Sequence, residues 1–141
     1  MELQILKRDV NVFYVEAKEF PNGISEAFHT LEDLHPSVCE RPFYGISNED
    51  KDRNIIYWAA VEESYKGEGA IYGCKTFVIS SGTYLTETIV DFMNNIHSIP
   101  KAFNNLLADP RRDLKFPCVE WYKNDREMMC MIKLKQGKEL N

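Results

Sequence analysis

The feature that most constrains the fold is an internal repeat. Residues 24–31 read Ile-x-x-Ala-Phe-x-x-Leu, and residues 99–106 read the same, 75 positions further along. At helical periodicity these apolar residues share one face, so the repeat predicts two amphipathic helices, over residues 24–34 and 99–107. Phe28 and Phe103 hold matching places on these faces, and we expect truncation of either to alanine to destabilise the fold by about 3–5 kcal/mol.

The segments around each helix repeat as well. Pro42 and Pro117 correspond at the same offset, and each precedes a short apolar segment with the character of a strand. A charged turn and a second apolar segment follow, and a further strand candidate precedes each helix. The predicted strands are residues 12–17, 43–46 and 55–61 in the first copy, and 83–89, 118–122 and 128–134 in the second. The order strand-helix-strand-strand thus occurs twice, within residues 12–61 and 83–134.

Two copies of one unit in 141 residues predict a single α+β domain over residues 1–141. We expect a pseudo-twofold duplication with an antiparallel sheet, two main helices packed on it and a central groove between the copies. A charged segment with three glycines, residues 62–75, separates the copies and precedes a short strand at 76–79. Grooves of this kind commonly bind small molecules.

The charge balance argues against some partners. The chain has 17 Lys and Arg against 22 Asp and Glu, a net charge of −5, whereas proteins that bind nucleic acid carry an excess of basic residues. We therefore expect no direct nucleic-acid partner. There is no apolar run of about 18 residues and no signal-peptide pattern, so we expect no membrane partner and a cytoplasmic location.

Metal and cofactor sites are not expected either. Zinc sites and thioredoxin-like motifs need closely spaced ligands, and the cysteines and histidines of this chain are scattered. They are Cys39, Cys74, Cys118, Cys130, His29, His35 and His97. The chain also lacks a glycine-rich phosphate-binding loop and a Gly-x-Ser-x-Gly motif. The sequence thus predicts no metal and no cofactor.

Three segments resemble the GyrI-like effector-binding family. They are residues 77–84 (FVISSGTY), the helix motif at residues 99–106 (IPKAFNNL) and the strand at residues 119–122 (VEWY). With the order of elements, the resemblance spans nearly the whole chain. It implies a bacterial domain that binds small molecules, including multiple drugs. Members occur fused to helix-turn-helix transcription regulators, alone as gyrase-modulating proteins, and in some cases as hydrolases of strained, cytotoxic natural products.

The chain departs from the family pattern in two places. The first repeat starts within the first twenty residues, so we expect a stand-alone member without a DNA-binding domain. The Gly-Pro pair that often lies between strand and helix is replaced by residues 91–95, Asp-Phe-Met-Asn-Asn. The first departure argues against direct control of transcription, and the second leaves the shape of one groove wall open.

Glu120 is the main candidate for ligand binding. It lies mid-strand at the position that matches the family's groove glutamate, and its counterpart in the first repeat is Gly45. A carboxylate opposite a residue without a side chain leaves room for a ligand. Because burial disfavours the charged form of a carboxyl group, a cationic ligand would relieve that cost. The simpler alternative is a solvated glutamate on the outer face of the sheet.

Aromatic side chains supply the rest of the predicted site. Tyr122 shares a face with Glu120 by strand alternation, and Tyr44, Trp58 and Tyr84 lie on strands that should flank the groove. A cation over such a ring gains about 0.5–2 kcal/mol. The alternative is that these rings belong to the core, where aromatic strand residues are often found.

Three functions remain open, and binding is favoured. In the first, the chain binds a small amphipathic molecule, cationic or planar, for sensing or sequestration. In the second, it is a hydrolase in which Glu120 directs water to an electrophilic carbon of a bound molecule. The sequence shows no second carboxylate or histidine paired with Glu120, so no other catalytic residue is assigned. The third is a protein-protein interaction, as in the gyrase-modulating members. Ligand identity and oligomeric state do not follow from the sequence.

Overall fold

The computed structural model describes residues 1–136, and the chain has an α+β fold with antiparallel strand pairing. It consists of two compact units, each of which contains one copy of the repeat. The β2–β5 unit spans Val10–Ile79, and the β6–β8 unit combines Met1–Asp9 with the chain from Ser80 onward. The predicted single domain over residues 1–141 stays a prediction, and its last residues, 137–141, lie outside the described residues.

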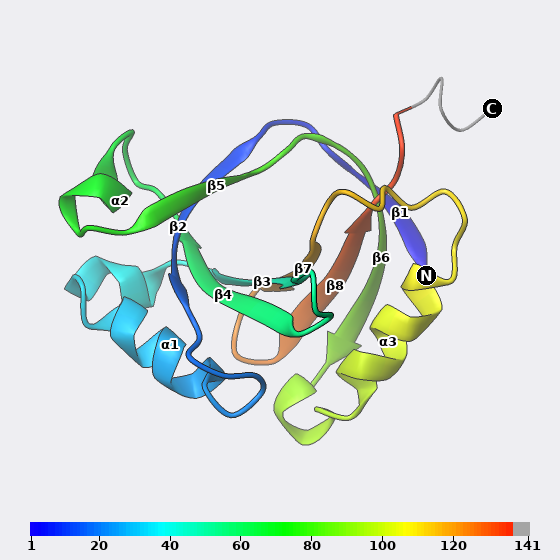
Figure 1. Cartoon of the computed structure of the whole chain (residues 1–141), viewed down its shortest axis with the longest axis horizontal. Helices are drawn as coiled ribbons and strands as arrows, with labels where there is room; N and C mark the ends of the chain where they lie inside the picture. Colours follow the sequence, from blue (N-terminus) through cyan, green and yellow to red (C-terminus); the bar gives the residue numbers. More distant parts are fainter. Residues whose placement is uncertain (137–141) are drawn as a thin grey trace. The chain divides into compact units, whose positions relative to one another are not determined.

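The β2–β5 unit has a four-stranded antiparallel sheet in the order β3-β4-β2-β5. Its strands are β2 (Val10–Glu16), β3 (Phe43–Glu49), β4 (Ile55–Glu62) and β5 (Lys75–Ile79). Helix α1 (Ile24–Glu32) lies beside β2 and β4 (Figure 1). Two short helices complete the unit, η1 (Pro36–Glu40) and α2 (Glu68–Ile71).

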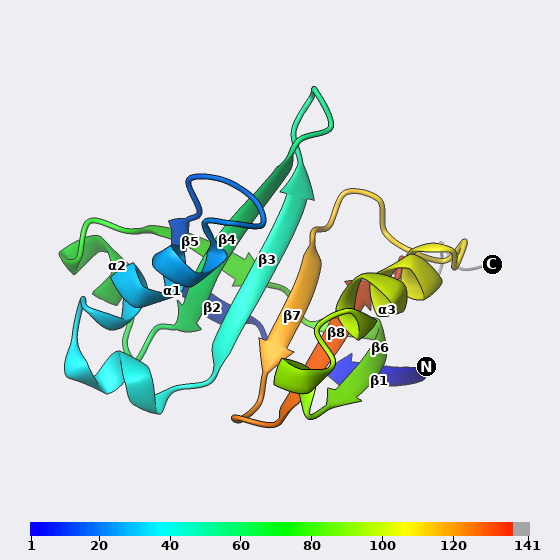
Figure 2. The same cartoon turned by 90° about the horizontal axis from the view of Figure 1, so that it is seen from below.

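The β6–β8 unit has the order β1-β6-β8-β7. Its strands are β1 (Glu2–Leu6), β6 (Gly82–Val90), β7 (Cys118–Tyr122) and β8 (Glu127–Lys133). Helix α3 (Ser98–Leu107) packs against β6 and β8 (Figure 2), and η2 (Phe92–Asn94) precedes it.

The two units share one topology. The order β3-β4-β2-β5 corresponds strand for strand to β7-β8-β6-β1, with α1 and α3 in equivalent places. The predicted duplication of a strand-helix-strand-strand unit is therefore confirmed. Each copy also carries an additional edge strand, β5 or β1. Neither β1 nor α2 was predicted from the sequence.

Each helix is anchored by an alanine and a leucine rather than by its phenylalanine. Leu31 of α1 and Leu106 of α3 are fully buried, and the alanines one turn earlier on each helix, Ala27 and Ala102, are also buried. Phe28 and Phe103 are half-buried at the side of these cores. Because the small alanine lets the helix approach the sheet closely, the larger ring lies beside the contact. The stability loss expected for the two phenylalanines stays a prediction, and the full burial of Leu31 and Leu106 leads us to expect the larger loss at the leucines.

No helix within residues 1–136 is long and apolar enough to cross a membrane.

Candidate functional site

Glu120 lies in the middle of a row of three side chains that crosses the β6–β8 unit. Its Cα pairs with Cys130 of β8, and Cys130 pairs in turn with Glu87 of β6. Cys130 belongs to the core that α3 covers. Because directly paired residues of a sheet point to the same face, both carboxylates lie on the helix-bearing face of this unit.

Tyr122 shares this face with Glu120, as predicted. Its hydroxyl donates a hydrogen bond to Oε1 of Glu120 at 2.9 Å. Its ring packs edge-on against Phe92 at 5.3 Å between centroids and contacts the core under α3. Both Glu120 and Tyr122 are half-buried. The hydrogen bond holds the Glu120 carboxylate beside the ring of Tyr122.

Glu87 was not considered in the sequence-based prediction. It is half-buried, and within residues 1–136 its side chain forms no hydrogen bond or ion pair. With about 4.8 Å between neighbouring strands, its backbone lies about 10 Å from that of Glu120. The sequence could have indicated Glu87, because this residue alternates with the buried residues Leu85 and Ile89. It therefore occupies a core-facing position of β6.

The carboxylates of Glu120 and Glu87 affect the pKa of the Cys130 thiol, which lies between them in the row. Burial, and then the charges of Glu120 and Glu87, raise the pKa of Cys130 far above its ordinary value. The thiol therefore stays protonated at neutral pH, and Cys130 is no nucleophile.

Gly45 occupies the place in the first copy that Glu120 occupies in the second. Each is the third residue of its strand, β3 or β7, and each pairs with a residue of the core under its helix, Ala59 or Cys130. The correspondence inferred from the repeat thus holds at the level of strand register.

Trp58 and Tyr44 lie on the other, helix-free face of the β2–β5 unit, because the residues that alternate with Trp58 in β4 form the core under α1. Trp58 stacks on Tyr14 at 4.1 Å and 15° and contacts Phe77 edge-on at 5.6 Å. Its Nε1 donates a hydrogen bond to Oε1 of Glu16 at 3.0 Å. This aromatic cluster, Tyr14, Trp58 and Phe77 with Glu16 at its edge, includes three residues that were not predicted.

Tyr84 is fully buried on the helix-free face of the β6–β8 unit. Its hydroxyl donates to the carbonyl of Ser80 at 2.6 Å, and burial raises its pKa to about 12.

Of the predicted site residues, the structure brings Glu120 together with Tyr122, and it places Tyr84 on the opposite face of the same sheet. Trp58 and Tyr44 share a face in the other unit.

No cluster of three or more His, Cys, Asp or Glu side chains suited to a metal ion exists in the part of the chain that the structure describes.

Comparison with known proteins identifies the fold but no family. No family model and no curated protein matches the sequence. An integron cassette protein from the mobile metagenome of Vibrio cholerae has a TM-score of 0.71 at 14% identity, over 95% of each chain. The protein SAV2435, solved bound to tetraphenylphosphonium, has 0.65 at 12%, over 99% of this chain and 96% of its own. A hydrolase from Listeria innocua has 0.59 at 10%, over 95% and 92%. At these identities the likeness concerns the fold alone.

Proposed function

We propose that the chain is a GyrI-like effector-binding domain that binds a small amphipathic organic cation at Glu120. The observation that carries the proposal is the row Glu87–Cys130–Glu120, which sets two half-buried carboxylates on the helix-bearing face of the β6–β8 unit. The fold supports it, because the similar protein SAV2435 was solved with an organic cation. The groove predicted between the repeats stays a prediction.

The physical reason is electrostatic. Two carboxylates on one partly buried face repel each other and lose hydration, and a cation bound beside them offsets both costs. At about 4 Å, with an effective dielectric constant near 20, a cation and a carboxylate attract by about 4 kcal/mol before desolvation. The ring of Tyr122 adds an apolar and polarisable surface for the organic part of such a ligand.

The test is calorimetric titration with tetraphenylphosphonium and with triphenylphosphine oxide, a neutral molecule of similar shape. Glu120→Gln keeps the size of the side chain and should weaken binding of the cation by about 5- to 150-fold, the range expected when a partly buried ionic contact becomes a neutral one. Binding of the neutral analogue should change little.

Glu127→Gln is the matched control. Glu127 is also a half-buried glutamate of this sheet, but it alternates with Met128 and so points to the helix-free face. Its variant should bind tetraphenylphosphonium as the parent does. Equal affinity of the parent and Glu120→Gln for the cation would remove Glu120 from the site.

Hydrolysis is the second candidate, favoured by the presence of Glu87 on the same face as Glu120. Two carboxylates on one face could then hold a water molecule, with one of them acting as the base. With styrene oxide as a probe, water would attack a ring carbon, the carbon–oxygen bond would open, Glu120 would accept a proton from the water and the alkoxide would take one from solvent.

Turnover is measured as the mass gain of one water molecule. If the chain is a hydrolase, Glu120→Gln should slow turnover by about a hundredfold or more while retaining binding. No turnover by the parent excludes this candidate for epoxides. No turnover together with unchanged cation affinity in the variant leaves the protein-partner function.

A further inference from the structure

Lys133, the last residue of β8, is a buried ammonium group that has no anionic partner among residues 1–136. Its side chain lies on the helix-free face, opposite to that of Glu120, and the residue is only 8% exposed. Within residues 1–136 its contacts are a hydrogen bond to the hydroxyl of Ser80 and the ring of Phe116, whose centroid is 5.1 Å away. Glu68, another buried charge, is instead paired with Arg41 at 2.8 Å.

Gly82, the first residue of β6, lies against the side chain of this lysine. Gly82 has φ of +146°, and a Cβ at this position would lie 3.1 Å from Cε of Lys133, so a side chain here would displace the lysine. The carbonyl of Ser80 accepts a hydrogen bond from Tyr84 at 2.6 Å, which fixes the residue whose hydroxyl meets the ammonium group. This accounts for the motif Ser-Ser-Gly-Thr-Tyr, which the Glu120 site does not use.

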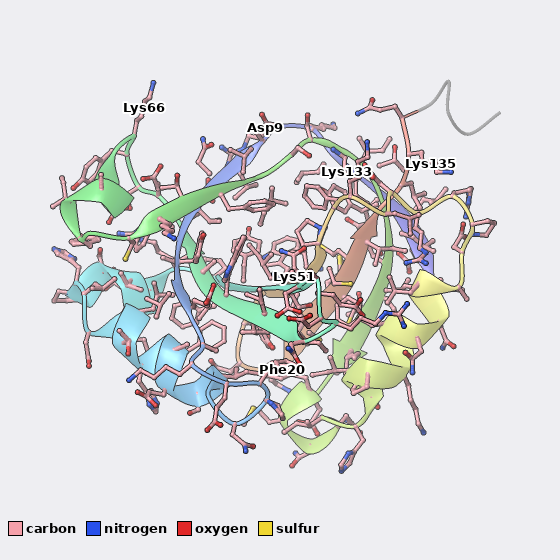
Figure 3. All side chains as sticks on the ribbon, viewed as in Figure 1. Asp9, Phe20, Lys51, Lys66, Lys133 and Lys135 are labelled. Atoms are coloured by element: carbon pink, nitrogen blue, oxygen red, sulfur yellow. The ribbon has the colours of Figure 1, made fainter. Side chains whose placement is uncertain are left out.

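The carboxylate of Asp9 does not pair with this lysine. Oδ1 of Asp9 accepts the backbone N–H of Ser81 at 2.7 Å, and Asp9 forms no ion pair with Lys133. Figure 3 shows both residues, with Lys133 near the end of β8. The ammonium group has three donors, and its hydrogen-bond acceptor in the described part of the chain is the hydroxyl of Ser80. Burying a charge in this way is unfavourable unless an anion completes its coordination.

We propose that Lys133, Ser80 and Phe116 form a binding site for the carboxylate of a small aromatic acid. One carboxylate oxygen accepts hydrogen bonds from the ammonium group and from the Ser80 hydroxyl, which can also donate. The aromatic body packs on Phe116, which meets the buried Tyr84 edge-on at 6.0 Å. Ser80 and Phe116 are both half-buried, so the ligand reaches the lysine from their side. A single lysine suits a monoanion better than a phosphate, for which arginine forks are common.

The test is an NMR titration with benzoate, followed at the backbone amides of Ser81 and Gly82, with neutral benzamide as the comparison ligand. We expect saturable shifts with benzoate only. Lys133→Met removes the charge and keeps the length of the side chain, and it should weaken benzoate binding by at least about tenfold. Ser80→Ala should weaken it by a smaller factor.

Lys123→Met is the matched control, because Lys123 also lies over an aromatic ring, that of Trp121, at 5.0 Å, but is half-buried. The Lys123→Met variant should bind benzoate with the same affinity as the parent. Lys133→Met should also melt at the same or a higher temperature than the parent, because a buried charge that serves binding lowers stability.

Three outcomes would overturn the proposal. They are the absence of saturation by about 20 mM benzoate in the parent, equal benzoate affinity in Lys133→Met, and a lower melting temperature of Lys133→Met combined with parent-like affinity in Ser80→Ala. If Lys133→Met does not fold, Ser80→Ala alone decides, since unchanged affinity in that variant contradicts the site. The tetraphenylphosphonium test concerns the opposite face of the sheet, so neither result determines the other.

Discussion

Arg41 and Glu68 form a fully satisfied ion pair in the β2–β5 unit. Both nitrogens of the guanidinium fork donate to the carboxylate, at 2.9 and 2.8 Å. Glu68 is 1% exposed and also accepts hydrogen bonds from the backbone of Ser64 and the hydroxyl of Tyr72. Arg41 in turn donates to the carbonyl of Glu62. The pair thus joins α2 and the segment after η1 to the end of β4.

Arg41→Met should lower the free energy of unfolding by about 3–5 kcal/mol, because it leaves the Glu68 carboxylate buried without its partner. The double variant Arg41→Met/Glu68→Leu should lose less, since it removes both charges. Urea unfolding measures both values. A loss in the single variant no greater than in the double variant would show that the pair is not coupled in this way.

The pH dependence of this stabilisation has a defined sign. The hydrogen bonds from Arg41 lower the pKa of Glu68 below its ordinary value of 4.5. The stabilisation of the fold by the ionised Glu68 carboxylate is therefore complete at pH values above its ordinary pKa. It is lost as the pH falls through the lower pKa of the folded state. The stability difference between the parent and Glu68→Gln should accordingly shrink as the pH is lowered from neutral to acidic.

Single residues were predictable from the sequence where a local pattern marked them. The mid-strand place of Glu120 and the shared face of Tyr122 follow from strand alternation, and Glu87 could have been found in the same way. Arg41 and Glu68 are 27 residues apart in loop and short-helix segments without periodicity. Nothing local to either residue indicates its partner.

At the scale of elements, α1 and α3 pack against their sheets in the same way. Each presents an alanine and a leucine to its sheet and a half-buried phenylalanine beside them. In α1, the ring of Phe28 rests against Phe43 at 5.4 Å and Tyr57 at 6.2 Å, so much of its contact lies at the edge of the core. The apolar stripe was predicted from the repeat, but the depth of each position in it was not.

Leu31→Ala and Leu106→Ala should each lower the free energy of unfolding by about 2–5 kcal/mol, because each leaves a cavity in a fully buried position. Phe28→Ala and Phe103→Ala should cost less than their leucine neighbours. Asn105→Ala, on the exposed side of α3, is the control and should be neutral or slightly stabilising. Denaturant melts in which the phenylalanine variants lose the most would restore the sequence-based expectation.

The faces of the strands explain why only part of the site was predicted. Alternation shows which residues of one strand share a face, but not which face a helix will cover. Tyr84 and Glu120 therefore looked equivalent in the sequence, and the packing of α3 places them on opposite faces. β1 lies ahead of the first copy as β5 lies ahead of the second, so the repeat offset could have indicated it, whereas α2 is only four residues long and has no periodic pattern.

At the scale of the molecule, the net charge of −5 favours cations in its surroundings. Raising the salt concentration from about 0.1 to about 1 M shortens the screening length from about 10 to about 3 Å. The affinity for tetraphenylphosphonium should therefore fall several-fold, and that for triphenylphosphine oxide should not. The ratio of the two affinities corrects for salt effects on apolar contacts. A ratio that does not change with salt would argue against electrostatic attraction of the ligand.

The pairing of β1 with β6 also bears on the order in which the chain acquires its structure during synthesis. Thr86 of β6 donates to the carbonyl of Glu2, 84 residues earlier, whereas the β2–β5 unit is continuous from Val10 to Ile79. On the ribosome, all four strands of that unit are available before the first pairing partner of β1 has been made. β1 therefore stays unpaired while the β2–β5 unit folds. It joins its sheet only after β6, the first strand of the second copy, has been synthesised.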